Sequence, residues 1–163
     1  MTVQVPYELT THSAEETQAL GEALGRLAQP GDLILLSGQL GAGKTCLTQG
    51  IARGLGIREP VRSPTFVLAT EHPGRLMLYH VDLYRIDSTL EAADLGLDDY
   101  IEGGGVCVVE WAEKALNVFP KEYLLVELEH TGPETRRVWL VPHGKRYVEL
   151  ASAMLSALAG EGR

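Results

Sequence analysis

The sequence of 163 residues is short of cysteine, of aromatic side chains and of long apolar runs. Its two cysteines, Cys46 and Cys107, have no C-x-x-C spacing, which excludes a disulfide framework and indicates reduced, buried thiols. No apolar run approaches the length that spans a membrane, and the N-terminus lacks the pattern of a signal peptide. We therefore expect a cytoplasmic protein with no membrane association.

Positive charge is also scarce, because 14 Lys and Arg face 22 Asp and Glu for a formal net charge of -8. Surfaces that bind nucleic acid directly collect Lys and Arg to neutralise phosphates. Any nucleic acid in the function of this chain is therefore expected to be held by a partner. The hydrophobic share of 45% is ordinary for a globular protein, and the length suits one domain over residues 1–163.

A glycine-rich segment at residues 38–45 fits the pattern G-x-x-x-x-G-K-T. An apolar run at residues 32–36 precedes it and predicts a buried strand, and apolar residues at four-residue spacing behind it predict a helix that begins near Lys44. Backbone N–H groups of such a loop, together with the helix N-terminus, bind phosphates. We expect Lys44 to reach the β and γ phosphates of a nucleotide and Thr45 to hold Mg²⁺.

Two later segments read as strands that end in acids. Residues 76–84 are expected to pair with residues 67–71 as a hairpin and to carry Asp82 to the edge of the sheet, as a direct or water-mediated ligand of Mg²⁺. His80, on the same strand face, is either a structural residue or a partner that orients Asp82. The sequence thus predicts a first acid beside the phosphate loop.

The second acid is Glu110, which ends the apolar run at residues 106–110 as a Walker B acid does. Lys44, Asp82 and Glu110 are the predicted catalytic residues, and the division of metal binding and water positioning between the two acids stays open. Trp111 either packs over the nucleotide or fills the core, and Glu113 could touch the ligand. Thr45, Asp82 and Glu110 are the predicted metal ligands.

A proline-marked loop follows the helix behind the glycine-rich segment. Pro64 favours an extended conformation at Ser63, so an ordered turn is expected. The loop is either a plain strand entry or a switch-like segment that senses the γ phosphate. The residues of this candidate switch are Ser63, Pro64, Thr65 and Phe66.

The remaining pattern completes an α/β prediction. Ser13 and Glu16 form a capping box that opens a helix. Further elements are expected as a strand at residues 3–9, short acidic helices within 88–102, a hairpin of 123–129 with 137–141 at the sheet edge, and a closing helix from Tyr147 to Leu158. Arg136 and Arg137, at the start of the second hairpin strand, are interpreted as solubility residues rather than as an arginine finger. The predicted fold is P-loop NTPase-like: a mixed β-sheet flanked by helices in three layers.

The order and spacing of these motifs together identify a protein family more specifically than any single motif does. The sequence resembles the TsaE (YjeE) family over nearly its whole length, through G-Q-L-G-A-G-K-T at 38–45, S-P-T-F at 63–66, H-V-D-L-Y-R at 80–85 and E-W at 110–111. It departs from the family pattern at Gln39, where an acid is usual, and at Cys46, where a hydroxyl residue is usual.

The resemblance implies a bacterial ATPase of tRNA threonylcarbamoyladenosine biosynthesis. It would use ATP and Mg²⁺, hydrolyse ATP weakly alone, work with the TsaB and TsaD proteins, and meet tRNA only through that complex. It also implies that the start of the first helix, around Ser13 and Ala14, lies near the nucleotide. The implied and predicted nucleotide-binding residues are Gly38, Gly41, Ala42, Gly43, Lys44, Thr45, Cys46, Trp111 and Glu113.

Two alternatives remain beside this interpretation. A small-molecule P-loop kinase would need an acceptor pocket and usually an arginine-bearing lid, whereas residues 86–105 offer mainly acids and glycines. A nucleotide-dependent interaction module would use ATP only to stabilise a shape that binds a partner.

Overall fold

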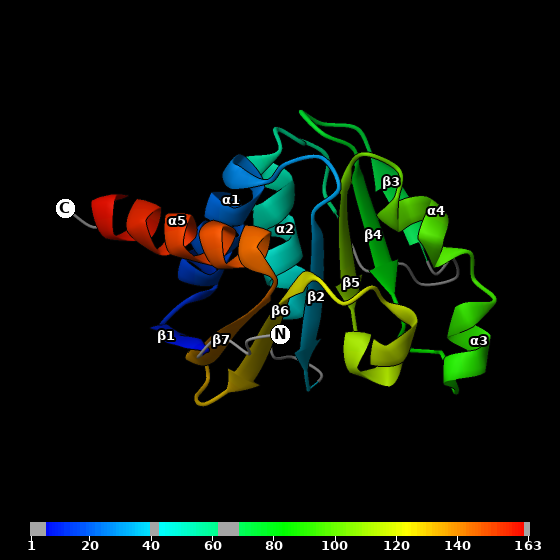
Figure 1. The fold of residues 1–163 in the computed structure, drawn as a ribbon. Coiled ribbons are helices and arrows are strands. Elements are labelled where there is room, and N and C mark those ends of the chain that lie inside the picture. The colour runs from blue at the N-terminus through cyan, green and yellow to red at the C-terminus, as the bar shows by residue number, and fades with distance from the viewer. Residues whose placement is uncertain (1–5, 40–42, 62–68, 162–163) are drawn as a thin grey trace.

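A seven-stranded sheet forms the centre of the molecule, in the order β1-β7-β6-β2-β5-β4-β3 (Figure 1). The structure is a computed structural model that describes residues 6–39, 43–61 and 69–161. Strand β2 (Leu33–Gly38) lies between β5 (Val106–Glu110) and β6 (Tyr123–His130) and is parallel to both. Strand β4 (Leu78–Asp82) continues the parallel part beside β5.

Antiparallel strands complete the sheet on both sides of this parallel centre. Strand β3 (Ala69–His72) pairs with β4 as the predicted hairpin. Strand β7 (Arg136–His143) pairs with β6, and β1 (Tyr7–Thr11) pairs with β7. The prediction of a mixed sheet is therefore confirmed.

Helices cover both faces of the sheet and make three layers, as predicted (Figure 1). The larger apolar cluster includes residues of α1 and α2 with Ile34 and Leu36 of β2, and the smaller one includes residues of α3, α4 and η1 with Leu33 and Leu35. This division follows the alternation of side chains along a strand. The helices are α1 (Ala14–Leu27), α2 (Lys44–Gly54), α3 (Thr89–Ala93), α4 (Leu97–Ile101), α5 (Lys145–Glu161) and the 3₁₀ helices η1 (Ala112–Lys114) and η2 (Leu116–Val118).

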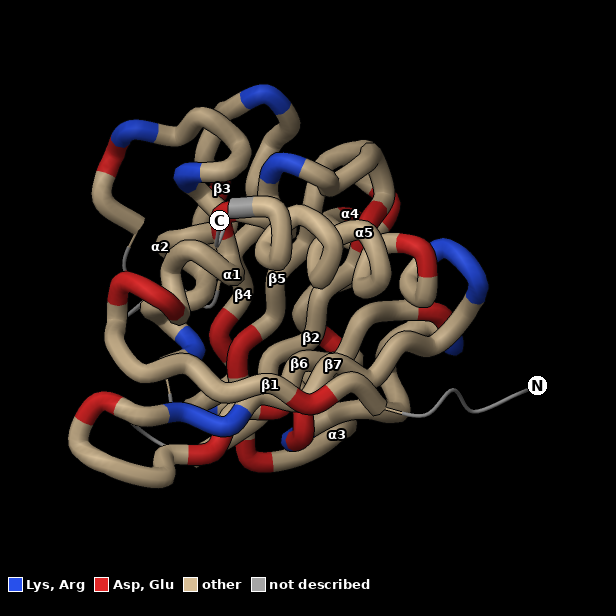
Figure 2. The backbone as a smooth tube through the Cα atoms, turned by 90° about the vertical axis from the view of Figure 1, so that its left-hand side faces the viewer, with Lys and Arg blue, Asp and Glu red and all other residues tan. Residues whose placement is uncertain are grey.

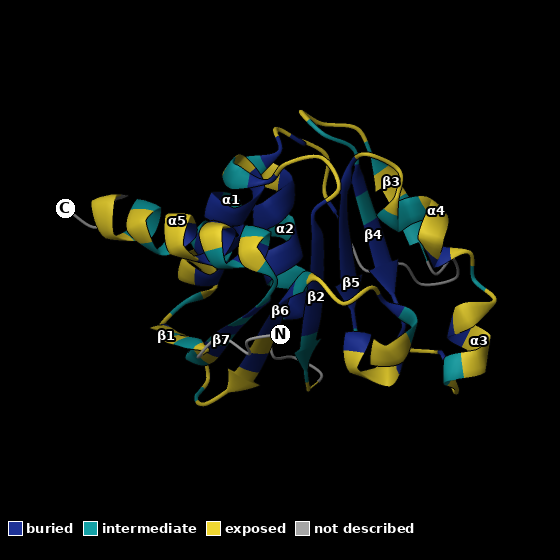
Figure 3. Ribbon diagram, viewed as in Figure 1, coloured by how far each residue is buried: buried dark blue, intermediate teal, exposed yellow. Residues whose placement is uncertain are grey.

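Burial on both faces explains why β2 reads as a continuous apolar run rather than as an alternating one. The central strands are buried along most of their length, while α3, α4 and the outer face of α5 are exposed in part (Figure 3). Acidic and basic positions are interspersed along the described chain (Figure 2). Within that described part, no helix is long and apolar enough to cross a membrane.

Helices α1 and α2, the second of which begins behind the glycine-rich segment, are in close contact. A Cβ atom on Gly50 would lie 2.1 Å from the carbonyl oxygen of Gln18, and one on Gly21 would lie 2.3 Å from that of Leu47. Helix α1 itself begins at the predicted N-cap, because the hydroxyl of Ser13 accepts a hydrogen bond from the backbone N–H of Glu16 at 3.1 Å. The Glu16 carboxylate accepts one from the backbone N–H of His12 rather than of Ser13. Glycines at the contact thus set where Lys44 stands relative to the sheet.

Two sequence predictions need correction. The hairpin of β6 and β7 does not lie at the sheet edge, because β1 pairs outside β7. The first strand runs from Tyr7 to Thr11 rather than ending at Leu9. Both errors have the same cause, since the long-range pairing of an N-terminal strand with a C-terminal one leaves no local pattern in the sequence.

Candidate nucleotide site

The carboxyl ends of three parallel strands meet at one edge of the sheet. Asp82 ends β4 directly opposite Glu110, which ends β5, and β5 pairs in turn with β2. Strand β2 ends at Gly38, and α2 begins behind it with Gly43 as N-cap residue, at a φ of 106° that favours glycine. This edge is where open α/β sheets bind ligands. Gly41 and Ala42, predicted to bind phosphate, lie outside the described residues.

Lys44 is almost fully buried at the first turn of α2, with 4% of its surface exposed. Its Nζ donates hydrogen bonds to the carbonyl oxygens of Gly38 and Gln39 and lies 3.8 Å from the ring centroid of Trp111. Burial lowers the pKa of the Lys44 amine, although the nearby carboxyls, first among them Glu113, raise it. A negatively charged ligand would favour the ammonium form, so the site is electrostatically suited to phosphate.

The carboxylate of Glu110 joins two side chains from different elements. The hydroxyl of Thr45 donates to Oε1 at 3.1 Å, and the imidazole Nε2 of His80 lies 2.5 Å from Oε2. Glu110 is buried, with 2% of its surface exposed. The structure therefore brings the predicted metal ligands Thr45 and Glu110 together, and it adds a contact that sequence reasoning missed. Of the two roles open to His80, orienting Asp82 is not supported, because among the described residues the imidazole contacts Glu110 and makes no hydrogen bond with Asp82.

Asp82 lies beside this pair at the end of β4. Its Oδ1 accepts a hydrogen bond from the backbone N–H of Tyr84 at 2.9 Å. Burial raises the pKa of the Asp82 carboxyl, and the charge of Glu110 acts in the same direction, against that hydrogen bond. Two acids held this close would gain from a cation between or beside them.

The residues at this edge fit a Mg²⁺ ion that is also bound by a nucleotide, rather than a metal ion held by protein side chains alone. Over residues 6–39, 43–61 and 69–161, no three His, Cys, Asp or Glu side chains are grouped to hold a metal. Mg²⁺ commonly binds one or two carboxylates and completes its shell with phosphate oxygens and water. Thr45, Glu110 and Asp82 supply this kind of partial shell, so the fit depends on a bound nucleotide.

Trp111 and Glu113 both reach the glycine-rich segment. Trp111 has a φ of 60°, and is the one non-glycine residue with positive φ in the described chain. This conformation sets its half-buried ring against the Lys44 amine, while the ring of Tyr84 lies 5.1 Å away on centroids. Glu113 accepts a hydrogen bond from the backbone N–H of Gly38 at 3.2 Å. Strained backbone at such a position is typical of functional sites.

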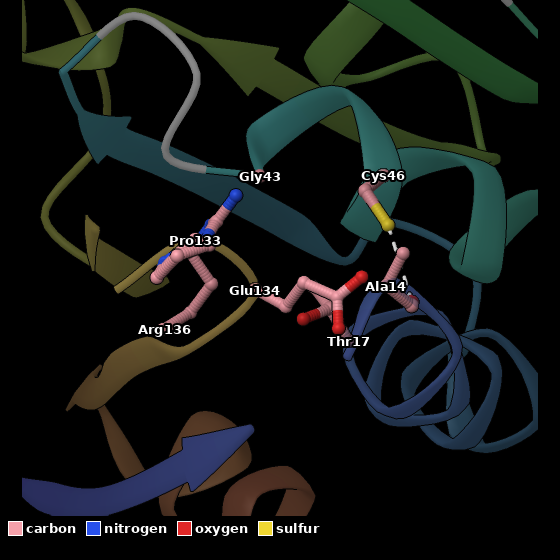
Figure 4. Close-up of a pocket in the computed structure, with 7 residues that line it drawn as sticks. All are labelled: Ala14, Thr17, Gly43, Cys46, Pro133, Glu134 and Arg136. Carbon is pink, nitrogen blue, oxygen red and sulfur yellow. Dashed lines mark hydrogen bonds between the residues drawn. The ribbon is translucent and has the colours of Figure 1, made fainter. Parts of the chain in front are cut away.

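A pocket of about 250 Å³ adjoins Gly43 on the side of α1 (Figure 4). The thiol of Cys46 donates to the carbonyl oxygen of Ala14 at 3.3 Å within it. Burial raises the pKa of this thiol. The lining residues are Ala14, Thr17, Gly43, Cys46, Pro133, Glu134 and Arg136.

Sequence reasoning missed the contribution of the β6–β7 hairpin to this pocket. The Nε atom of Arg136 lies 3.7 Å from where a Cβ atom of Gly43 would stand. Its Nη1 donates to the carbonyl oxygens of Gly132 and Thr135, so the guanidinium is held by its own hairpin. Arg136 therefore lines the pocket beside Gly43. Arg137 instead pairs with Glu8 on the neighbouring strand, at 3.2 Å. No signal in the sequence separates these two arginines, because the sheet order decides which one faces the pocket.

The candidate switch residues Ser63, Pro64, Thr65 and Phe66 lie outside the described residues. The last described residue before them is Val61, whose carbonyl oxygen accepts a hydrogen bond from Nε2 of Gln49 at 3.2 Å. The switch-like role stays a prediction.

Comparisons with known proteins show which family the chain resembles. The family model "Threonylcarbamoyl adenosine biosynthesis protein TsaE" matches residues 11–138. Two relatives carry the name tRNA threonylcarbamoyladenosine biosynthesis protein TsaE. The one from Bacillus subtilis (strain 168) is 43% identical over 145 residues, 88% of this chain and 90% of the relative. The one from Treponema pallidum (strain Nichols) is 40% identical over 128 residues, 78% of this chain and 95% of the relative.

A solved structure supports the same grouping. The crystal structure of Bacillus subtilis YdiB superposes with a TM-score of 0.82 at 36% sequence identity, covering 96% of this chain and 98% of that one. Sequence and fold therefore agree over almost the whole length. The chain belongs to the TsaE family.

Proposed function

We propose that this chain is the Mg²⁺-dependent, ATP-hydrolysing subunit of tRNA threonylcarbamoyladenosine biosynthesis. The observation that carries the proposal is the joining of Thr45, from the phosphate loop and its helix, to Glu110 at the end of β5, with Lys44 buried beside them. The named relatives supply the biosynthetic context.

The residues of the site have separable tasks in this proposal. The Lys44 amine leaves the carbonyl oxygens of Gly38 and Gln39 and binds phosphate oxygens, where it stabilises the charge that develops during phosphoryl transfer. Thr45 and Glu110 hold Mg²⁺, which when bound neutralises charge on the β and γ phosphates. Asp82 stands on the neighbouring strand, where its carboxylate can orient the attacking water.

The partners in this proposal are the TsaB and TsaD proteins, and tRNA is bound through them in the cytoplasm. The net charge of -8 and the interspersed charges in Figure 2 support indirect contact with tRNA, since a direct contact surface would gather basic residues. A partner that closes over the carboxyl edge of the sheet would exclude bulk water from the site, so we expect weaker hydrolysis by the isolated chain than by the complex.

The test is tRNA modification by purified TsaB and TsaD over many turnovers, with and without this chain and ATP. We expect sustained modification only with both, and none above background with Lys44→Ala. An unchanged rate without the chain, or with Lys44→Ala, contradicts the proposal.

The same assay separates hydrolysis from nucleotide-dependent binding. Glu110→Gln keeps the shape of the side chain but lacks the charge that holds the cation. We expect this variant to lose both hydrolysis and repeated modification. A variant that does not hydrolyse ATP and yet supports the full modification rate would instead favour the interaction module.

A further inference from the structure

The imidazole of His80 is a fully buried polar side chain beside the site, and the proposed reaction does not use it directly. None of its surface is exposed, and Nε2 contacts the Glu110 carboxylate at 2.5 Å. Its other ring nitrogen, Nδ1, is buried and makes no hydrogen bond with any residue that the structure describes. A buried polar atom without a partner destabilises a fold, so this arrangement needs a reason.

Packing does not supply that reason. His80 lies between Leu78 and Asp82 on the strand face that belongs to the larger apolar cluster, and its register partner on β5 is Val108. An aliphatic side chain at position 80 would fill such a position without an unpartnered nitrogen. What an aliphatic side chain lacks is the hydrogen bond to Glu110.

That hydrogen bond fixes one end of the Glu110 carboxylate. An ionised carboxylate only accepts hydrogen bonds, so the imidazole donates through Nε2–H to Oε2. The other oxygen, Oε1, then faces the hydroxyl of Thr45 at 3.1 Å. With both oxygens held, the carboxylate cannot rotate freely about its last torsion. Oε1 therefore stays where Thr45 and a cation can share it.

We propose that His80 is a positioning residue, which holds the Glu110 carboxylate in the orientation that binds Mg²⁺ with Thr45. This inference rests on the proposed Mg²⁺-nucleotide site and adds a residue to it. Partners that orient a metal-binding carboxylate typically change metal affinity or activity by about 10-fold to 100-fold when they are removed.

Two amide variants give a matched test. The amide nitrogen of His80→Gln reaches about as far from the backbone as Nε2 and can donate to Glu110. That of His80→Asn reaches only as far as Nδ1, so the donor is displaced. His72→Asn is the control, since His72 is a partly buried histidine on β3 whose Nε2 bonds to Thr70 instead. Two quantities are measured for the wild type and the three variants. Calorimetric titration gives the ADP affinity in Mg²⁺ and in EDTA, and a hydrolysis assay gives the Mg²⁺ concentration for half-maximal ATP hydrolysis.

We expect ADP affinity in EDTA to change less than about twofold in all variants, because phosphate binding by Lys44 does not involve His80. We expect His80→Asn to raise the Mg²⁺ requirement about 10-fold and to lose most of the gain in ADP affinity that Mg²⁺ gives. In His80→Gln, the Mg²⁺ requirement and the gain in ADP affinity should both stay within about threefold of the wild-type values. Wild-type behaviour of His80→Asn, or an equal loss in both amide variants, overturns the inference.

A measurement on the wild-type protein covers the case in which the variants do not fold. Long-range ¹⁵N–¹H spectra of the histidines report which ring nitrogen carries the proton. We expect the His80 proton on Nε2, and a proton on Nδ1 alone overturns the inference. If Mg²⁺ does not raise the ADP affinity of the wild type at all, the proposed function fails instead, so the two failures are distinguishable.

Discussion

Buried ionisable side chains lie at both ends of the central strand β2, and those at its beginning, unlike a histidine at the other end, are fully paired within the described part of the fold. At its beginning, Asp32 accepts hydrogen bonds from Nε and Nη2 of Arg146 at 3.0 and 2.6 Å and from the backbone N–H of Gln29 at 2.8 Å. The hydrogen bonds to Asp32 raise the pKa of Arg146. The Tyr147 hydroxyl also accepts from the backbone N–H of Leu33, at 3.0 Å. Each charge at this end has its partner within the fold.

At the other end, burial disfavours the charged forms of two side chains, and one buried ring nitrogen lacks a hydrogen bond to any described residue. Burial lowers the pKa of Lys44 and raises that of Asp82, and one nitrogen of His80 has no hydrogen bond within the described chain. The first arrangement stabilises the native state by itself, whereas the second is completed by a ligand. This difference predicts that substitutions at the two ends will separate stability from activity.

The largest expected effect is on hydrolysis at the second end. Replacing Lys44 with alanine removes the cation that stabilises charge on the transferred phosphoryl group. ATP hydrolysis should fall by about a hundredfold or more, as when a key electrostatic group is lost from an active site. Thermal unfolding without nucleotide should be unchanged or shifted upward, because burial already disfavours this amine. Lys121→Ala, an exposed lysine before β6, is the control and should change neither quantity.

The converse result is expected at the first end. Arg146→Met leaves Asp32, which is 4% exposed, without its cation and should lower the free energy of unfolding by about 3 kcal/mol, as measured by urea denaturation. ADP affinity of the folded variant should stay within about twofold. Arg137→Met breaks the exposed pair with Glu8 and should lower the free energy of unfolding by less than about 1 kcal/mol. Equal destabilisation by Arg146→Met and Arg137→Met would contradict the claim that the buried pair at the beginning of β2 stabilises the fold.

Local patterns predicted one end of β2 much better than the other. The motif at residues 38–45, the acids at two strand ends and the N-cap at Ser13 are all local, and their elements stand where expected. The bidentate pair of Asp32 with Arg146 joins residues 114 positions apart and leaves no periodicity to read. The sequence likewise could not show that Arg136 lines a pocket with α1. That neighbourhood depends on the order of the strands, in which the N-terminal β1 pairs with the C-terminal β7.

A smaller effect is expected on the thermal stability of a variant at Asp82. Its pKa is raised in the native state, so the wild type loses stability as the pH rises from below the unfolded-state pKa through the native-state value. Asp82→Asn has no such loss and can still accept the hydrogen bond from Tyr84. In EDTA its Tm should exceed that of the wild type by about 2 °C at neutral pH and by less in acid. A lower Tm at neutral pH would mean that the carboxylate stabilises the fold.

The smallest expected effect concerns the two thiols. Burial raises the pKa of Cys107 to about 12, so it should not react with iodoacetamide until the protein unfolds. Cys46 is half-buried in the pocket beside Gly43 and should react slowly, and more slowly still with Mg²⁺-ADP present. Mass spectrometry of the labelled peptides measures both rates. Cys46 labelling that nucleotide does not slow would remove this pocket from the nucleotide site.

The most direct test of the site is the affinity of ATP for the wild type and for Glu110→Gln, measured by calorimetry in Mg²⁺ and in EDTA. If Thr45 and Glu110 hold the cation beside the phosphates, Mg²⁺ will raise the affinity of the wild type about tenfold or more and will not raise that of the variant. Equal wild-type affinity under both conditions, or the same gain in Glu110→Gln, would contradict the assignment of this edge of the sheet as a Mg²⁺-nucleotide site.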